Sequence, residues 1–379
     1  MTELREEELI YDWNYAQDSA PPLSPPRLVD HTLAAIRLSP SIQLPGLEQQ
    51  QDILILLERL GLHHLCLGSW ADPQVRKLSP ACRDVEVRGW VEVPPGPMPS
   101  SSLGSYFSHR YPGWRDFCLQ SQGPGVLVIQ DATRATPKEL SSILSQLPGT
   151  PIQAVCLSDD GGRALPSGAR RLVEFVQLAL QRLGLDLEIE WSGRNDRGLA
   201  VASALAAWKA GAQALHCSLF SLGEGCGLVS TEQLLVNLTL AGSLRRDLKS
   251  LGEVSQRLSS ILGFPLHANL PIIGADAFRT GTGVHAAAIL KAQKKGHDWL
   301  ADLIYSGVPA SQFGFRQQVE VGPMAGASNV HFWLDQKGLE RTAERVQAIL
   351  AQAKSSQRIL SEEELLAIVG RADQNGGPP

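Results

Sequence analysis

The amino-acid sequence predicts an α/β fold: a (β/α)8 TIM barrel followed by a smaller, mostly helical C-terminal domain. From about residue 28 to residue 242, short apolar or β-branched runs alternate with longer segments of helical periodicity, which is typical of parallel strands joined by helices. The alternation gives close to eight such units, as a barrel of about 250 residues requires. After about residue 245 the pattern becomes mainly helical, so we expect a second domain there.

The expected strands are short runs of apolar and β-branched residues. They lie at residues 28–33, 62–67, 85–93, 126–130, 152–157, 187–191 and 214–220, and we assign the eighth βα unit to residues 231–244. The segments between them show helical spacing and end at Gly or Pro. Residues 94–114 interrupt the alternation, and their Pro, Ser and Gly content predicts a long loop that is either disordered or a lid.

The predicted organisation has four parts. They are an N-terminal extension at residues 1–27, the barrel at 28–245, the helical domain at 246–370 and a flexible tail at 371–379. The tail ends in the polar run DQNGGPP, which has no apolar periodicity and is therefore expected to fray.

The composition argues against several classes of partner. With 34 Lys and Arg against 39 Asp and Glu, the formal net charge is −5, so we expect no nucleic acid partner. No stretch of about 18 apolar residues and no secretory leader occur, which predicts a cytoplasmic protein that does not enter a membrane. The six Cys residues form no CxxC pair, which favours buried free thiols over a metal or redox site.

Several motifs occur in order along the barrel and the second domain. The barrel contains VDHTLAAIRLSPSI, VIQDATRA, LSDDGGRALP, EWSGRNDRGLAVASALAAWKAGA and SLGEGCG, and the second domain contains GADAFRTGTGVHAAAILK, IYSGVPASQFG and GPMAGASNVHFWL. Together they closely resemble the isopropylmalate, homocitrate and Re-citrate synthases of the DRE-TIM metallolyase superfamily. The resemblance covers the chain from about residue 10 to residue 369.

The resemblance implies a metal-dependent Claisen condensation of an acyl-CoA with a 2-oxo acid, in a pyruvate carboxyltransferase-type domain. A divalent metal polarises the oxo acid as a Lewis acid, and an arginine stabilises the developing oxyanion. The implied metal ligands are an aspartate, two imidazoles and usually an amide-type neighbour, all at strand ends.

This chain differs at the implied arginine and metal positions. Ala34 and Ala35 stand where the family's DETLRDG motif has the catalytic arginine and the metal-binding aspartate. Ser192 and Arg194 replace the imidazole pair of EWHGHND, and a guanidinium cannot ligate a metal at all. Because the aspartate and the two imidazoles that would bind the metal are missing, we expect no metal and no cofactor.

Further positions differ in the same direction. Gly225 and Leu228 stand at the arginine and the asparagine of the GERTGN motif, and Gln130 replaces an acidic residue in the mid-barrel motif. The third-strand motif that supplies a barrel-interior arginine in the family also differs, with Glu92 near that place. We therefore expect a pseudoenzyme that is inactive in the ancestral reaction and acts as a non-catalytic or regulatory subunit.

Some polar residues of the motifs are retained or newly introduced. One interpretation is that they line a surviving small-molecule pocket for a carboxylate, and the other is that most of them cap helices or close turns. The candidate substrate-binding residues are Asp30, Asp131, Arg134, Asp159, Arg194, Asn195 and Glu224.

The second domain retains two residues that the resemblance makes candidate catalytic groups. His285 and Tyr305 fall at or near the family's second-domain histidine and tyrosine, which act on the partner subunit's barrel. The resemblance thus implies a homodimer, or a heterodimer with an intact synthase paralogue, in which the helical domain dimerises and covers the active site.

Three alternatives stay open on the sequence alone. The chain could be a repurposed, metal-independent acyltransferase or lyase, in which Arg194 supplies positive charge and Asp131, Asp159 or Asp160 acts as a base. It could also still be an active acyltransferase of the 2-isopropylmalate synthase type. The third alternative is a folded but idle gene copy.

Overall fold

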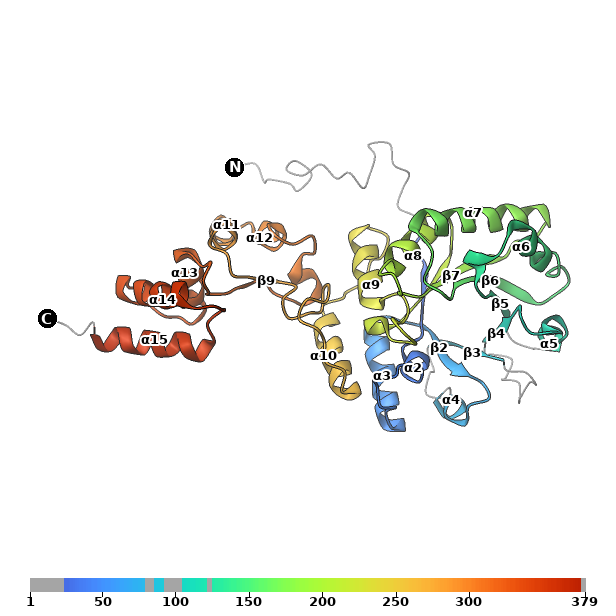
Figure 1. The fold of residues 1–379 in the computed structure, drawn as a ribbon, viewed down its shortest axis with the longest axis horizontal. Helices are drawn as coiled ribbons and strands as arrows, with labels where there is room; N and C mark the ends of the chain where they lie inside the picture. Colours follow the sequence, from blue (N-terminus) through green and yellow to red (C-terminus); the bar gives the residue numbers. More distant parts are fainter. Residues whose placement is uncertain (1–23, 79–84, 92–103, 121–124, 376–379) are drawn as a thin grey trace. The chain divides into compact units, whose positions relative to one another are not determined.

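The computed structural model describes residues 24–78, 85–91, 104–120 and 125–375. These residues fall into two compact units that divide between Pro265 and Leu266, and each unit is described by itself (Figure 1). The expected helical domain starts at residue 246, whereas the first compact unit continues through α10 (Leu251–Leu262) because this helix packs on α3 (Leu47–Arg59). The expected extension at 1–27 and tail at 371–379 lie partly outside the described residues.

The first unit is a closed barrel of eight parallel strands, as the sequence predicts. Each strand pairs with the next along the chain, and the first pairs with the last. The strands are β1 (Arg27–Asp30), β2 (His64–Ser69), β3 (Glu86–Trp90), β4 (Gly104–Ser108), β5 (Gly125–Ile129), β6 (Ile152–Asp159), β7 (Glu188–Gly193) and β8 (Ala214–Cys217).

Helices follow the strands and cover the outside of the barrel (Figure 1). In α7, buried Ala169, Val173, Val176 and Leu180 recur at helical spacing and form the face that packs inward. Besides α3 and α10, these helices are α2 (Thr32–Ile36), α4 (Pro73–Leu78), α5 (Trp114–Gln120), α6 (Pro137–Leu144), α7 (Pro166–Arg182), α8 (Ala200–Lys209) and α9 (Thr231–Leu240), with short 3-10 turns η2 (Ala132–Arg134) and η3 (Leu219–Ser221).

The structure corrects two of the expected barrel elements. Residues 104–108, which we expected within a long loop, form the fully buried strand β4. Residues 231–244, which we expected to hold the eighth strand, contain only α9, the helix that follows β8. The segment GSYFS was missed because it lacks β-branched residues and lies in a Pro/Ser/Gly-rich stretch; residues 94–103 of the expected lid lie outside the described residues.

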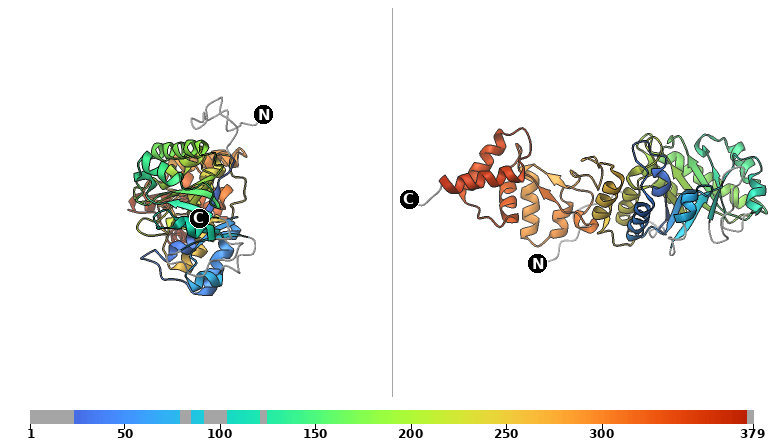
Figure 2. Two further views of the ribbon diagram at one scale, coloured as in Figure 1. Left: turned by 90° about the vertical axis from the view of Figure 1, so that its right-hand side faces the viewer. Right: turned by 90° about the horizontal axis from the view of Figure 1, so that it is seen from below.

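The second unit is mostly helical, as predicted. Helices α14 and α15, drawn red in Figures 1 and 2, pack together through Ile349, Ala353, Leu365 and Ile368. The elements are β9 (Arg279–Thr280), α11 (Gly283–Lys294), α12 (Asp298–Leu303), η4 (Ala310–Phe313), β10 (Gln318–Val319), α13 (Ala327–Gln336), α14 (Ala343–Ser355) and α15 (Glu362–Asn375). The two short strands form a parallel pair.

Two further sequence expectations concern cysteine and the membrane. Cys66, Cys118, Cys156 and Cys217 are free and buried, and Cys226 is free and exposed. Among the described residues, no helix has both the length and the apolar character that crossing a lipid bilayer requires.

The loop after β8 depends on a glycine that no other residue can replace without strain. Gly227 has a φ of +69°, and a Cβ there would lie 1.5 Å from the Ser221 carbonyl oxygen. Gly198 has nearly the same φ, +68°, but nothing within 4 Å of its Cβ position. The loop conformation therefore restricts Gly227 through a close approach as well as through its dihedral angle.

We predict that Gly227→Ala lowers the free energy of unfolding far more than Gly198→Ala. The left-handed conformation alone costs about 1 kcal/mol for alanine, and the clash at residue 227 adds on the order of 3 kcal/mol or more. Urea unfolding of the two variants measures the difference. Equal midpoints would contradict the backbone geometry described for this loop.

Candidate functional site

A cavity with convergent polar groups lies at the carboxyl ends of the barrel strands, and we call it the mouth pocket. It has a volume of about 700 Å³. Its lining includes His31, Ala34, Ala35, Arg37, Asp72, Trp90, Gln130, Ser158, Asp159, Asp160, Ser192, Arg194, Glu224 and Leu228. This end of a (β/α)8 barrel is where substrates bind in enzymes of this fold, so the mouth pocket is the candidate site.

The mouth pocket contains the positions at which the resemblance implies a metal. Ala35, Ser192, Arg194 and Leu228 all line it and offer a methyl, a hydroxyl, a guanidinium and an isobutyl group. A divalent metal needs carboxylate, imidazole or amide donors, and a guanidinium would repel it. The residues present at these positions therefore do not fit the implied metal.

Arg194 is held in place by two carboxylates. Its Nε donates to Asp196 at 3.1 Å, and its Nη1 lies 3.4 Å from a Glu224 oxygen. A Cβ at Gly225 would lie 2.5 Å from Nη2 of Arg194, so a side chain at residue 225 would collide with the guanidinium. The observed position of the Arg194 guanidinium thus depends on the absence of a side chain at residue 225.

The formal charge of the mouth pocket is negative. Two guanidinium groups, from Arg37 and Arg194, face four carboxylates, so the lining carries a formal net charge of −2 when His31 is neutral. The carboxylates are those of Asp72, Asp159, Asp160 and Glu224. Arg37 is itself paired with Asp72 at 2.7 Å, so little positive charge is left for an anionic ligand.

The floor of the mouth pocket is a chain of buried polar groups inside the barrel. His31 Nε2 lies 2.8 Å from His216 Nδ1, and His216 Nε2 lies 2.9 Å from a Glu190 oxygen. Arg88 Nη1 donates to the other Glu190 oxygen at 2.6 Å. Since β3 and β7 are not neighbours in the barrel, this last ion pair crosses its interior.

Burial and charge set the protonation of this chain. Burial lowers the pKa of His31 well below its usual value, and the nearby His216 lowers it further. Burial alone would raise the pKa of Glu190, but its hydrogen bond and charge contact with His216, together with Arg88, bring it down to about 2. Glu190 is therefore ionised at neutral pH while His31 is uncharged.

One described trio of side chains converges closely enough to raise the question of a metal. The ligand atoms of Cys156, Glu190 and His216 lie within 4.8 Å of one another. Both Glu190 oxygens are already engaged, by Arg88 and by His216, and burial raises the pKa of the Cys156 thiol well above its usual value. The trio is therefore a hydrogen-bonded part of the floor, since a metal would need the thiolate and free carboxylate oxygens.

Three of the predicted substrate-binding residues come together in the mouth pocket: Asp159, Arg194 and Glu224. The Asp159 carboxylate accepts hydrogen bonds from Thr133 Oγ1 at 2.7 Å and from the backbone N–H of Ala164 at 2.8 Å. Its oxygens thus hold the turn after β6, while Arg194 and Glu224 remain at the rim.

Two other predicted residues have contacts that hold the barrel together and are not part of the pocket lining. Asp30 is buried, and its oxygens accept from the Thr32 backbone N–H and the Thr231 hydroxyl, both at 2.9 Å. Asn195 Oδ1 accepts from the backbone N–H of Ala200 at 3.3 Å, at the start of α8. Each side chain thus bonds the first backbone N–H of a helix, although neither Asp30 nor Asn195 is the N-cap residue of that helix.

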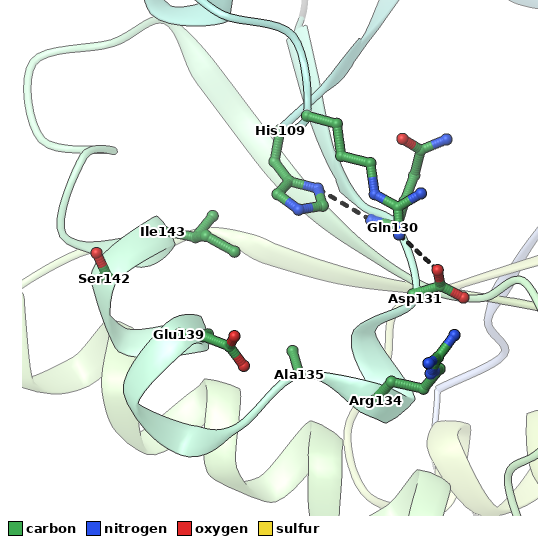
Figure 3. A pocket seen from close by; sticks show the side chains of 9 residues that line it. His109, Gln130, Asp131, Arg134, Ala135, Glu139, Ser142 and Ile143 are labelled. Atoms are coloured by element: carbon green, nitrogen blue, oxygen red, sulfur yellow. Dashed lines mark hydrogen bonds and ion pairs between the residues drawn. The ribbon is translucent and has the colours of Figure 1, made fainter.

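The remaining two candidates, Asp131 and Arg134, line a second cavity of about 540 Å³, which we call the side pocket (Figure 3). In this view the Arg134 side chain extends toward Asp131, and Asp131 is paired with Arg110. His109 Nδ1 accepts from the backbone N–H of Gln130 at 3.1 Å. Gln130 lines both pockets, so the two cavities share one wall.

In the second unit, the two predicted catalytic residues form a pair. The rings of His285 and Tyr305 stack with centroids 3.4 Å apart, and His285 Nδ1 lies 3.0 Å from the Thr280 hydroxyl. Tyr305 is 45% exposed. Residues 20 positions apart in the sequence thus present one compact polar and aromatic group at the surface of this unit.

Sequence reasoning missed the floor of the mouth pocket. Arg88, Glu190 and His216 lie on β3, β7 and β8, His31 directly follows β1, and no short motif links them. The third strand does supply an interior arginine, Arg88, whereas we expected that feature to be changed; Glu92 lies outside the described residues. The available signal was the alternation of strand side chains, which puts Arg88, Glu190 and His216 on inward positions.

Comparisons with known proteins agree with the fold and the motifs. The HMGL-like family profile matches residues 122–258. The chain is 27% identical over 289 residues to a homocitrate synthase of Sulfolobus acidocaldarius, covering 73% of this chain and 59% of that protein. It is 27% identical over 227 residues to a probable 2-isopropylmalate synthase of Methanopyrus kandleri, covering 59% of this chain and 43% of that protein. The chain thus spans about half the length of these relatives.

A solved structure shows the same fold. The HMG-CoA lyase of Bacillus subtilis superposes with a TM-score of 0.50 at 16% identity, covering 66% of this chain and 98% of that protein. At this identity the likeness supports the barrel architecture alone.

We predict that Asp30→Asn makes the protein more stable relative to wild type at pH 7 than at pH 4. Burial raises the pKa of Asp30 to about 6, above the value of about 3.9 in an unfolded chain. The folded state therefore takes up a proton below pH 6, and the cost of the buried charge appears as the pH rises from 4 to 6. Asparagine keeps the acceptor for Thr32 and removes that charge.

The expected gain of the variant over wild type between pH 4 and pH 7 is on the order of 2 kcal/mol. Urea unfolding of both proteins at the two pH values measures it. A difference between variant and wild type that does not change with pH would show that Asp30 is not a buried, titrating carboxyl group.

Proposed function

Since the chain belongs to the DRE-TIM metallolyase superfamily, whose synthases condense an acyl-CoA with a 2-oxo acid, we propose that it is a non-catalytic subunit of such a synthase. In this proposal its own barrel performs no metal-dependent condensation. Its second unit completes the active site of an intact synthase paralogue in a heterodimer located in the cytoplasm. A homodimer is the alternative assembly.

One contrast carries the proposal. The residues that the barrel would need for its own chemistry are absent, with Ala34, Ala35 and Arg194 in their places. The residues that the second domain would contribute to a partner are present, and His285 and Tyr305 form a stacked, partly exposed pair. A chain that had lost all activity through random change would have no reason to keep only the contributed half.

The surface around His285 supports contact with a partner. Val284 is 75% exposed and Met324 is 70% exposed, and the backbone N–H of Gly283 donates to the Met324 carbonyl at 3.1 Å. Together with Tyr305 they form an exposed apolar group beside the histidine. Exposed apolar side chains of this kind, next to a polar functional residue, are typical of a surface that another protein covers.

The barrel's inactivity follows from electrostatics. Loss of one preorganised donor to an oxyanion typically costs about 10² to 10³ in rate, and here both the metal donors and the arginine are missing. The negative lining also disfavours a 2-oxo acid bearing one or more carboxylates. A carboxylate ligand, if one binds, would have to displace the exposed Glu224 from Arg194.

We predict that this chain complements a defective paralogue. An intact synthase from the same organism, with its own second-domain histidine changed to alanine, is inactive alone and regains thiol release from acyl-CoA when mixed with the full-length chain. His285→Ala in this chain lowers the recovered rate of thiol release at least 10-fold, because a positioned proton-transfer group accelerates a reaction about 10²-fold or more.

The matched control is His267→Asn. His267 is an exposed residue of the same unit, and its backbone carbonyl accepts a hydrogen bond from the Leu270 N–H, which the substitution leaves in place. It is expected to complement as well as wild type. Recovery of only homodimers from the native host, with no complementation, would overturn the heterodimer.

A second prediction concerns the barrel. The fourfold variant Ala35→Asp, Ser192→His, Arg194→His, Leu228→Asn restores the implied ligand set and is expected to bind one Mn²⁺ per chain, measured by calorimetry. Wild type and the single variant Ala35→Asp are expected to bind none with this stoichiometry. Equal binding by wild type would show that the donor set described here is misassigned.

A further inference from the structure

We propose that the mouth pocket is a metal-independent proton-transfer site in which His31 Nδ1 is the base and His216 and Glu190 carry the proton into the barrel. The inference goes beyond the proposed function, which concerns the second unit and a partner. It rests on the chain of contacts from His31 to Arg88 and on the position of His31 at the pocket floor.

The proposal requires one particular tautomer of each imidazole. An ionised Glu190 only accepts, so the proton shared with His216 belongs to His216 Nε2. Of the two ring nitrogens that meet, we assign the shared proton to His31 Nε2, which then donates to His216 Nδ1. Neutral His31 is left with a bare Nδ1, and no described residue hydrogen-bonds this atom.

The bare nitrogen faces the cavity. His31 is 91% buried, since only 9% of it is exposed, and it is one of the residues that line the mouth pocket. The opposite edge of its ring contacts His216, with ring centroids 4.9 Å apart. A ligand that enters the pocket therefore meets an unprotonated imidazole nitrogen in a position where a general base acts.

The interior ion cluster has room for the transferred proton. Arg27 and Arg88 are paired with Glu86, Glu188 and Glu190. Two positive charges thus face three negative ones, and the formal charge of the cluster is −1. A proton accepted at His31 Nδ1 allows the Nε2 proton to pass to His216 Nδ1. The imidazolium then lies beside Glu190, and the charge of the cluster is neutralised; His64, beside Glu86 at the opposite end of the strands, is the other group that could supply that charge.

Other titratable groups face the two imidazoles from neighbouring strands. The Tyr106 ring lies 6.4 Å from His31 and 5.7 Å from His216, and Cys156 Sγ lies 3.6 Å from His216 Nε2. Burial raises the pKa of both Tyr106 and Cys156, so neither ionises near neutral pH. Arg88 from β3 is the remaining charged neighbour of His31.

The pocket favours an uncharged carbonyl compound with a hydrogen on the adjacent carbon. The C–H bond breaks, the proton moves to His31 Nδ1, and the electron pair becomes an enolate whose oxygen accepts from Ser192 or Arg194 in the same lining. Return of a proton from His31 regenerates the compound. In D₂O the returning particle is a deuteron, so the step needs no other reactant and leaves a label.

The test uses the full-length chain alone with hydroxyacetone or dihydroxyacetone as the probe and pyruvate as the charged comparison. Deuterium incorporation followed by ¹H NMR is expected to exceed the buffer rate by about 100-fold for the uncharged probes, as a general base provides. Pyruvate is expected to exchange more slowly because of the four carboxylates in the lining. Since the pKa of His31 lies well below its usual value, His31 stays neutral from pH 6.5 to 8, and the exchange rate is expected to stay level over this range.

Two variants separate a base from a merely structural histidine. His31→Gln keeps an N–H donor for His216 Nδ1 but removes the bare nitrogen, and exchange should fall to the buffer rate. His267→Asn, in the other unit and without a described side-chain contact, should leave exchange unchanged. Equal rates for His31→Gln and wild type, or no exchange by wild type, would overturn the proposal.

A measurement on the wild type keeps the test independent of how variants fold. ¹⁵N NMR of histidine-labelled protein is expected to show Nε2–H tautomers for both His31 and His216, with Nδ1 of His31 unprotonated at pH 7. A protonated Nδ1 on neutral His31 would contradict the relay. Because no partner subunit takes part, complementation can fail while this exchange is observed, and the reverse also holds.

Discussion

The ion pair between Arg88 and Glu190 is the contact around which the inside of the barrel is organised. It joins β3 to β7 across the interior, and both side chains are almost completely withdrawn from solvent. Removing one partner of such a pair leaves an uncompensated buried charge, which typically costs about 3 to 5 kcal/mol. Glu190 also accepts from His216, which in turn contacts His31. The pair therefore determines the polar floor of the mouth pocket.

Above this floor, the pocket combines the superfamily's location with different chemistry. Arg194 occupies space that a side chain at residue 225 would need, and the two rim carboxylates of Asp196 and Glu224 hold it. At the implied ligand positions the lining has Ala35, Ser192, Arg194 and Leu228, which do not fit a divalent metal, and it carries more carboxylates than guanidinium groups. The second unit, by contrast, presents His285 and Tyr305 together. The mouth pocket and the His285–Tyr305 pair thus lie in different units of the chain.

The sequence predicted the barrel and the second unit because strand and helix periodicity are local properties. It failed at β4, whose GSYFS segment carries no β-branched residue, and at residues 231–244, where only a helix follows β8. At the site, motif positions located Arg194, Asp159 and Glu224 in one pocket. They could not reveal that Asp30 and Asn195 bond the first backbone N–H of α2 and of α8. Nor could they reveal that His31 meets His216, 185 residues away, because this contact depends on the closure of the barrel.

The residues at the implied ligand positions lead us to expect that the barrel binds no divalent metal. Elemental analysis of the full-length chain, purified without chelators from its native host and assayed for thiol release with and without EDTA, tests it most directly. We expect less than stoichiometric divalent metal and no EDTA-sensitive release of thiol from acyl-CoA in the presence of a 2-oxo acid. One bound divalent metal per chain, together with release that EDTA abolishes, would contradict it.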